Sequence, residues 1–377
     1  MAQTLWFVGL TTLDVVHRSA VPASRDQKVT ASWQGVAAGG PAANAAVVAA
    51  RLGERAILIT AIGDGPIAEV VRADLATQGV TVIDLADEQF QLAVSAILVD
   101  EATGERSVVS PDGGQWPGPQ PHAFTNALTS NSVVGANETT ATDSPGNHKS
   151  TLSPVTAKDT TERSNAAFPE AILFDGHHLG IIRQVIEWLT QQQKQPLIIL
   201  DGGRWKPIFT ELFPIADVAA LSNDFIVPNY PNALTGGLAL GAKSVVITNG
   251  GNPVKWQTKE DNGAVTPPQV KATDTLGAGD FFHGALTVAL AHQKPLPAAI
   301  TFANQIAALR VQHLGSREWL NYLGTAAVEK AENTAARAHV TMMPAEQFDL
   351  MVNALDDSTP IPELVALAHK PQRIIQK

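Results

Sequence analysis

One segment near residue 280 has the residue types that phosphate chemistry requires. It reads Asp274-Thr-Leu-Gly-Ala-Gly-Asp280-Phe-Phe-His-Gly-Ala285 and opens an apolar helix. Residues 277–279 have little or no side chain, so their backbone N–H groups can close around an anion, and the positive helix end adds to the attraction. Asp280 falls in the first helical turn, where a carboxylate beside a phosphate suits removal of a proton from an attacking hydroxyl. We predict a phosphoryl-transfer site with Asp280 as general base. The competing interpretation is a plain helix cap behind a tight turn.

Two polar residues near the N-terminus are candidate ligand contacts. Asp14 follows an apolar run at residues 5–10 that is typical of a buried strand. Ligands of open α/β sheets bind beyond the carboxyl ends of strands, and a carboxylate there can accept two hydrogen bonds from hydroxyl groups. Asn44 lies one turn into an alanine-rich helix at residues 42–52, which Gly39-Gly40-Pro41 introduces. Its amide faces either the same ligand or solvent, and the sequence leaves both open.

These segments resemble the motifs of the ribokinase/PfkB family of carbohydrate kinases. The stretch from Asp274 to Asp280 is similar to the family's C-terminal motif, and Gly39-Gly-Pro-Ala-Ala-Asn44 is similar to its N-terminal glycine motif. The two motifs occur in the family's order, and the resemblance extends over about residues 5–320, except for an insertion. The ketohexokinase-like members are the most similar, because they also share Gly9-Leu10, Leu13-Asp14, Asp26 and Trp33-Gln34.

The resemblance implies an ATP-dependent sugar kinase that uses Mg²⁺. In such an enzyme Asp280 would activate a sugar hydroxyl, and the backbone of Gly277, Ala278 and Gly279 would form an anion hole. The residues that would hydrogen-bond the sugar are Asp14, Asp26, Gly40 and Asn44. Arg106 lies where related kinases often place a residue that touches the substrate or the transferred phosphate, although a solvated hairpin arginine is the competing interpretation.

The resemblance also implies nucleotide contacts. They comprise Thr275 and the glycines of the C-terminal motif, together with Asn223, Thr248 and Gly250. Many members carry Asn-x-x-Glu where this chain has Asn223-Asp-Phe-Ile226, and that glutamate helps to organise the magnesium. The metal ligand is therefore unassigned, with Asp224 as the substitute that we consider. Pro41 replaces a polar residue of some relatives, which leaves the identity of the sugar open, and dependence on a monovalent cation is equally open.

Strands and helices alternate along most of the chain, which predicts a mainly parallel sheet with helices on both faces. This agrees with the three-layer ribokinase-like α/β fold of the family. Strands near residues 27–34, 93–100 and 106–110 would form a small β lid over the sugar. We expect a kinase domain at residues 1–320, interrupted by a disordered insertion at 125–167 that is rich in Ser, Thr, Asn and Asp. We predict that residues 321–377 form a helical C-terminal extension.

Composition narrows the class of partner. The net charge of −10 repels nucleic acids and anionic lipids, so we expect neither nucleic acid nor membrane as a partner. The first apolar run has no positively charged leader before it, and no stretch approaches the ~20 apolar residues that cross a bilayer, so we expect a cytoplasmic location. The chain has no cysteine, which excludes disulfides and a cysteine nucleophile. The expected partners are ATP and a sugar, and a homodimer is left open. Two alternatives also remain: a nucleoside kinase of the same fold, and a non-catalytic regulator that binds sugar or nucleotide.

Overall fold

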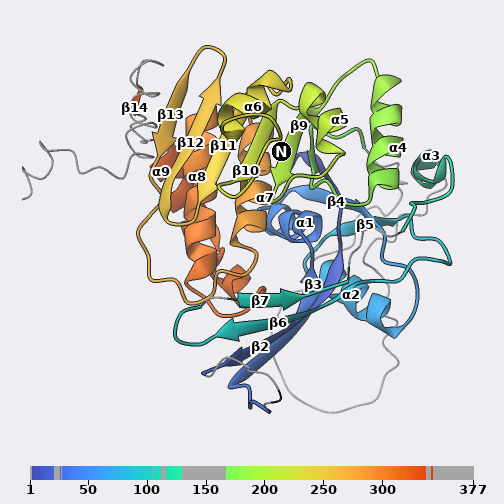
Figure 1. The fold of residues 1–377 in the computed structure, drawn as a ribbon, viewed down its shortest axis with the longest axis vertical. Helices are drawn as coiled ribbons and strands as arrows, with labels where there is room; N and C mark the ends of the chain where they lie inside the picture. Colours follow the sequence, from blue (N-terminus) through green and yellow to red (C-terminus); the bar gives the residue numbers. More distant parts are fainter. Residues whose placement is uncertain are drawn as a thin grey trace, which may run out of the picture.

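The main sheet forms the middle layer of the molecule. The computed structural model describes residues 2–20, 26, 28–104, 106–111, 116–129, 167–336 and 341–342. The strands of the main sheet are β1 Thr4–Val8, β4 Arg55–Thr60, β5 Thr81–Asp84, β8 Ala171–Phe174, β9 Leu197–Gly202, β10 Val218–Ser222, β11 Ser244–Asn249, β12 Asn252–Thr258, β13 Asn262–Val265 and β14 Thr341–Met342. Their order is β14-β13-β12-β11-β10-β9-β8-β1-β4-β5 (Figure 1). The strands from β11 to β5 in this order are parallel, whereas β12, β13 and β14 are antiparallel additions at one edge.

Helices cover both faces of this sheet, which confirms the predicted three-layer α/β fold. One face is covered by α1 Pro41–Arg51, α2 Pro66–Thr77, α7 Ala278–Ala291, α8 Leu296–Val311 and α9 Thr325–Ala336. The other is covered by α3 Ala123–Thr129, α4 Leu179–Thr190, α5 Phe209–Leu212 and α6 Ala233–Ala239. The central strands are apolar throughout because both of their faces are buried; residues 5–8 of β1, for example, are fully buried. Two short 3₁₀ helices, Phe213–Ile215 and Glu318–Tyr322, follow α5 and α8.

A glycine on α7 allows the two helices that carry the predicted motifs to pack closely. A Cβ atom at Gly284 would lie 2.3 Å from Val48 Cγ1 and 2.5 Å from the Ala45 carbonyl oxygen, both on α1. The backbones can approach this closely because position 284 has no side chain. As a result, the first turn of α7 lies beside the start of α1, and the two motifs meet although about 235 residues separate them.

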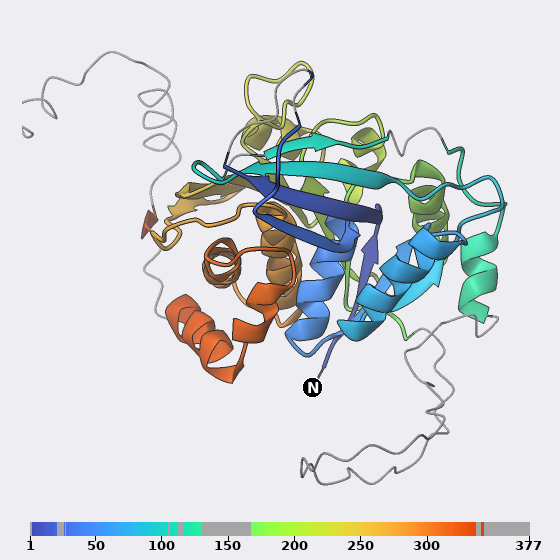
Figure 2. The same ribbon diagram turned by 90° about the horizontal axis from the view of Figure 1, so that it is seen from below.

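A second sheet of four strands forms the predicted lid. Its strands are β2 Thr12–Ser19, β3 Trp33–Gly39, β6 Val94–Asp100 and β7 Arg106–Val109, in the order β3-β2-β6-β7. The lid stands at one end of the main body in Figure 1, and Figure 2 shows its blue and teal strands from below, with α1 and α2 nearby. The strands β6 and β7 lie where the hairpin was predicted.

Two details of the predicted lid were wrong. The strand expected near residues 27–34 begins only at Trp33, and its second half is a Gly-Ala segment whose β-propensity is low. The strand β2 was not predicted, and Asp14 lies within it and not in a turn after the first strand. The strand β2 pairs with β3 on one side and with β6 on the other, and this pairing stabilises the lid strands. Because these strands are short and half-exposed, their sequences alone do not show which strands pair.

The expected insertion and the C-terminal extension are described only in part. The helix α3 extends to Thr129, so residues 125–129 do not belong to the insertion. Residues 130–166 lie outside the described residues. The helix α9 falls in the expected helical extension, and residues 337–340 and 343–377 of that extension again lie outside the described part. Within the described part of the chain, no helix is both long and apolar enough to cross a membrane.

Candidate active site

Asp280 is held in place by residues from α1 and from the chain after α8. The amide Nδ2 of Asn44 donates a hydrogen bond to Asp280 Oδ2 at 2.9 Å. Asn44 itself is buried, and Arg317 Nη1 donates to its Oδ1 at 3.4 Å. Arg317 also donates to the Ala38 carbonyl oxygen at 2.7 Å and forms an ion pair with Asp74 at 3.0 Å. This network fixes one oxygen of the Asp280 carboxylate and leaves its other oxygen for a ligand.

The surroundings of Asp280 make its carboxyl group a stronger base than an ordinary aspartate. Burial, and then the nearby Asp201, raises the pKa of Asp280 to about 7, although Asn44 and His283 oppose this shift. Asp201 is the last residue but one of β9 and is buried, with its Oδ2 at 2.9 Å from His283 Nδ1. Burial lowers the pKa of His283, but the Asp201 carboxylate outweighs it, and the net shift is upward. A general base is most effective when its pKa lies near the working pH, and Asp280 meets this condition.

The lid supplies Asp14 to the same place. Asp14 lies opposite Ser95 of β6 and accepts a hydrogen bond from Thr12 Oγ1 at 2.7 Å. Burial raises the pKa of Asp14, while Thr12, Ser95 and Arg317 hold the shift back. Its carboxylate acts on the pKa of Asp280 and is itself influenced by Arg317, so the lid residue and the α7 residue share one site. A Cβ atom at position 39 would lie 2.1 Å from the Asp14 carboxyl carbon, which explains the glycine there.

The two other residues predicted to bind the sugar differ in their placement. Gly40 caps the N-terminus of α1 with φ +94°, and a Cβ atom there would lie 2.3 Å from the Leu10 carbonyl oxygen. Its backbone therefore lies next to Asn44, at the site. Asp26 lies in an exposed turn with φ +60°, and among the described residues no contact joins it to the site. Its role stays a prediction.

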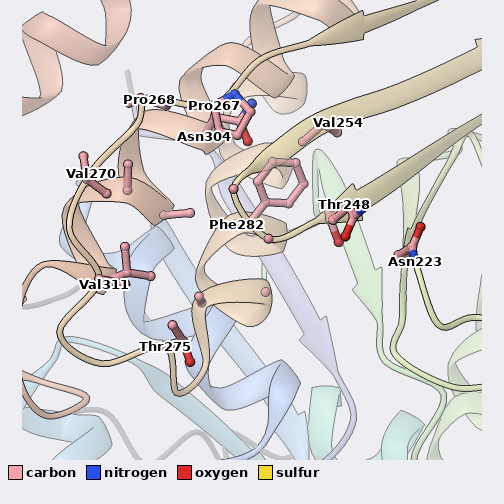
Figure 3. A pocket seen from close by; sticks show the side chains of 18 of the residues that line it. Asn223, Thr248, Val254, Pro267, Pro268, Val270, Thr275, Phe282, Asn304 and Val311 are labelled. Carbon is pink, nitrogen blue, oxygen red and sulfur yellow. The ribbon is translucent and has the colours of Figure 1, made fainter. Parts of the chain in front are cut away.

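A cavity of about 570 Å³ adjoins the glycine turn on the other side of Asp280. It lies between α7 and α8 on one side and the ends of β10 and β11 on the other (Figure 3). Among its lining residues are Arg106, Asn223, Asp224, Thr248, Gly250, Thr275, Ala278 and Gly279, all of which were singled out from the sequence. A Cβ atom at Gly277 would lie 3.3 Å from Asn44 Nδ2 and 3.6 Å from Asp280 Oδ2, whereas Ala278 and Gly279 line the cavity, so the glycine turn borders both the cavity and the Asp280 side.

The remaining wall of the cavity is mostly apolar. The ring of Phe282 lies at the centre of Figure 3, with Thr248 and Asn223 on one side and Val270 and Val311 on the other. Such a wall suits a flat, uncharged group, and the polar residues at the other end of the cavity suit phosphates.

Asn304, on α8, was not predicted from the sequence. Its side chain is buried and lines the cavity, and its Nδ2 has no hydrogen-bond partner among the described residues. An unpaired buried amide costs free energy, so its position points to a ligand. The only sequence signal is a polar residue in the otherwise apolar stretch Phe302-Ala-Asn304, which is also typical of ordinary helix packing.

Asp201 and Arg317 were missed as well. Asp201 follows the apolar run Leu197-Ile-Ile-Leu200, which is typical of a buried strand, so the rule that selected Asp14 could have selected it too. Arg317 gave no signal, because it contacts Asn44 across 273 positions of the sequence.

The site fits a magnesium ion only in cooperation with bound phosphates. Within the described residues, no group of three or more acidic, histidine or cysteine side chains gathers into a metal site. Mg²⁺ commonly uses one or two carboxylates together with substrate phosphates and water. Asp224 supplies a carboxylate on the wall of the cavity and agrees with this pattern.

Comparison with known proteins identifies the family. A profile of the pfkB family carbohydrate kinases matches residues 2–121 and 217–323. The ribokinase of Haemophilus influenzae is 24% identical over 328 residues, which cover 84% of this chain and 95% of that protein. The ribokinase of Bacillus subtilis is 38% identical over 80 residues, which cover 21% of this chain and only 27% of that protein.

Solved structures show the same fold. Ribokinase from Giardia lamblia has a TM-score of 0.66 and 14% identity, covering 90% of this chain and 100% of that one. Arabidopsis thaliana ribokinase, complexed with ribose and ATP, has a TM-score of 0.60 and 18% identity, covering 86% and 99%. The chain thus has the ribokinase-like fold and belongs to the pfkB family of carbohydrate kinases. Such kinases are phosphotransferases that use an alcohol group as acceptor.

Proposed function

We propose that this chain transfers the γ-phosphate of ATP to a hydroxyl group of a monosaccharide, with Asp280 as the general base. The observation that carries the proposal is the position of Asp280 between two different surroundings. On one side lie Asn44 and the lid residue Asp14, which can bind hydroxyl groups. On the other side the glycine turn leads into the apolar and polar cavity, which suits a nucleotide.

In the proposed reaction Asp280 takes the proton of the attacking hydroxyl as the new O–P bond forms. The bond between the γ-phosphorus and its bridging oxygen breaks, and the electron pair leaves with ADP. The N–H groups of residues 277–279 would bind the charge on the transferred phosphoryl group. In the structure the N–H of Ala278 donates to the Thr275 carbonyl oxygen at 3.2 Å, so this donor would have to exchange that bond for one to the phosphoryl group. Asp14, Gly40 and Asn44 hold other hydroxyl groups, so that the reacting one is oriented. Mg²⁺ bound to the phosphates supplies neutralising charge, and Asp224 would hold it.

We place the parts of ATP according to the apolar and polar ends of the cavity. We assign the adenine to the apolar end beside Phe282, with the Asn304 amide as a hydrogen-bonding partner for the base. Asn223, Thr248, Gly250 and Thr275 would contact the ribose and the phosphates. Arg106 is exposed but donates to Thr275 Oγ1 at 3.1 Å, so we assign it a place near the transferred phosphate and not a purely solvated one.

The identity of the sugar is the open part of the proposal. The residues shared with ketohexokinase-like kinases favour a ketose or a related sugar, but the relatives found by comparison are mostly ribokinases. An inositol 3-kinase of Arabidopsis thaliana is also 37% identical over 71 residues. A nucleoside acceptor and a non-catalytic regulator remain the alternatives. The cytoplasmic location and the absence of nucleic-acid and membrane partners stay predictions, and the homodimer stays open.

The experiment that tests the function is ADP release from Mg-ATP over a panel of ketoses, aldoses, cyclic polyols and nucleosides. We expect turnover with one monosaccharide. Turnover with nucleosides alone would establish the nucleoside kinase. If no acceptor reacts and calorimetry still detects sugar binding, the chain is a regulator and the kinase proposal is wrong.

A dependence on pH follows from the raised pKa of Asp280. The base must be deprotonated to accept a proton, and its pKa is raised to about 7. We therefore expect kcat/KM for the sugar to be low in mildly acidic solution, to rise through neutral pH and to level off above it. Binding of ATP, measured over the same pH range, is the control, because phosphate groups also titrate nearby. A profile that is flat through neutral pH would contradict the assigned role.

A further inference from the structure

Arg310 is a fully buried cation beneath the glycine turn. It lies near the C-terminal end of α8, and its side chain is inaccessible to solvent. Burying an unpaired charge is very costly, so its partners must compensate for the loss of water. Its hydrogen-bond acceptors are all oxygen atoms: the guanidinium donates to Asp274 Oδ2 at 3.2 Å, and to the carbonyl oxygens of Asp274 at 3.2 Å, Leu276 at 2.8 Å and His313 at 3.0 Å. The guanidinium also lies over the Phe281 ring, 5.8 Å from its centroid.

These oxygen atoms belong to two backbone segments that the guanidinium joins. Asp274 and Leu276 form the approach to the glycine turn, and His313 follows α8. The Asp274 carboxylate reinforces the connection, because it accepts hydrogen bonds from the backbone N–H groups of Leu276 at 2.9 Å and Gly315 at 3.0 Å. The position of the turn thus depends on a positive charge at the centre of these segments.

The set of oxygen atoms around the guanidinium is also the kind that binds metal cations. Carbonyl and carboxylate oxygens are the ligands of hard cations, and three carbonyls with one carboxylate would suit a single positive charge. Here the two terminal amino groups of Arg310 already occupy these oxygens. An additional cation at this point would have to displace a buried arginine or lie beside its charge.

We propose that the guanidinium of Arg310 serves as a built-in cation that positions the glycine turn, so that turnover needs no monovalent cation at this loop. The proposal rests on the anion-binding role proposed above for residues 277–279. Arg310 touches neither ATP nor sugar in this proposal, and it acts as a positioning residue through Asp274 and Leu276.

The first test uses the unmodified protein, so it does not depend on the folding of any variant. Turnover is measured at one ionic strength in potassium, sodium and tetramethylammonium chloride. We expect the same rate in all three salts. A rate that rises several-fold in potassium over tetramethylammonium, with unchanged ATP binding, would overturn the proposal.

The second test vacates the proposed cation position with Arg310→Ala. Loss of the turn geometry is expected to lower kcat by about 10²-fold, similar to loss of an oxyanion-hole donor. Added potassium or guanidinium should then raise the rate of the variant by about tenfold, because a tenfold factor corresponds to the free energy of about one hydrogen bond to a charged group. Tetramethylammonium, which cannot enter the small space, should have no effect. A merely structural role would not produce this selective rescue.

A readout without turnover separates this proposal from the proposed function. Potassium should raise the Tm of Arg310→Ala relative to tetramethylammonium, because an ion that binds only the folded state stabilises it, and the Tm of the unmodified protein should not respond. The matched control is Arg72→Ala, because Arg72 also donates to a carboxylate and a carbonyl oxygen, those of Asp84 and Gly63, away from the site. Equal responses of Tm to potassium in both variants would overturn the proposal, even if no acceptor sugar had been found.

Discussion

Replacing Asp280 by asparagine is expected to lower kcat by at least about 10²-fold, because the amide cannot accept the proton of the attacking hydroxyl. Asparagine has nearly the same shape and can still accept the hydrogen bond from Asn44 Nδ2. The pKa of Asp280 is raised in the folded protein from 3.8 to about 7, so its ionisation lowers the stability of the fold as pH rises between these values, and the neutral amide removes this cost. The variant should therefore fold at least as well as the unmodified protein.

The measurement is the rate of ADP release with the best acceptor sugar, together with calorimetric binding of ATP. We expect ATP affinity to remain largely unchanged while turnover is lost. Asp14→Asn is the comparison, because Asp14 is assigned to sugar binding and should chiefly raise KM for the sugar. Full turnover of Asp280→Asn would exclude Asp280 as the base, and equal losses of kcat in both variants would argue against the division of roles.

Gly277→Val is expected to lower kcat by about 10²-fold through the geometry of the anion hole. Gly277 has φ +71°, a backbone conformation that a β-branched residue strongly disfavours. A Cβ atom there would also lie 3.3 Å from Asn44 Nδ2 and 3.1 Å from the Phe281 ring. The turn must shift to relieve these contacts, and its N–H groups then no longer converge on the transferred phosphoryl group.

The matched control for backbone strain is Gly53→Val. Gly53 follows α1 with φ +93°, and no described atom lies within 4 Å of a Cβ atom built there. Both variants should lose stability, by about 1–2 kcal/mol from the left-handed conformation, and thermal unfolding would measure this loss. Only Gly277→Val should lose turnover beyond its loss of folded protein. Equal kcat values for the two folded variants would show that residues 277–279 do not form the anion hole.

Much of the fold and part of the site follow from short stretches of sequence. Buried parallel strands are apolar on both faces and helices have their own period, so the alternation of the two predicts the three-layer sheet without any long-range information. The turn before α7 could be predicted for a similar reason. Its small residues and Asp280 lie within seven consecutive positions, and the local backbone alone brings them together.

The sequence by itself therefore determined the kinase family, the parallel sheet and the residues of the glycine turn. Only the tertiary structure decided what surrounds them: Asp201 beside Asp280, Arg317 on Asn44 and Arg310 under the turn. It also decided that Asp14 reaches the site from a lid strand, which depends on pairing with β3 and β6. The physical reason is distance along the chain. Contacts between residues that are tens or hundreds of positions apart depend on how helices and strands pack. The residues next to a single buried arginine or asparagine in the sequence show no pattern from which its distant partners could be predicted.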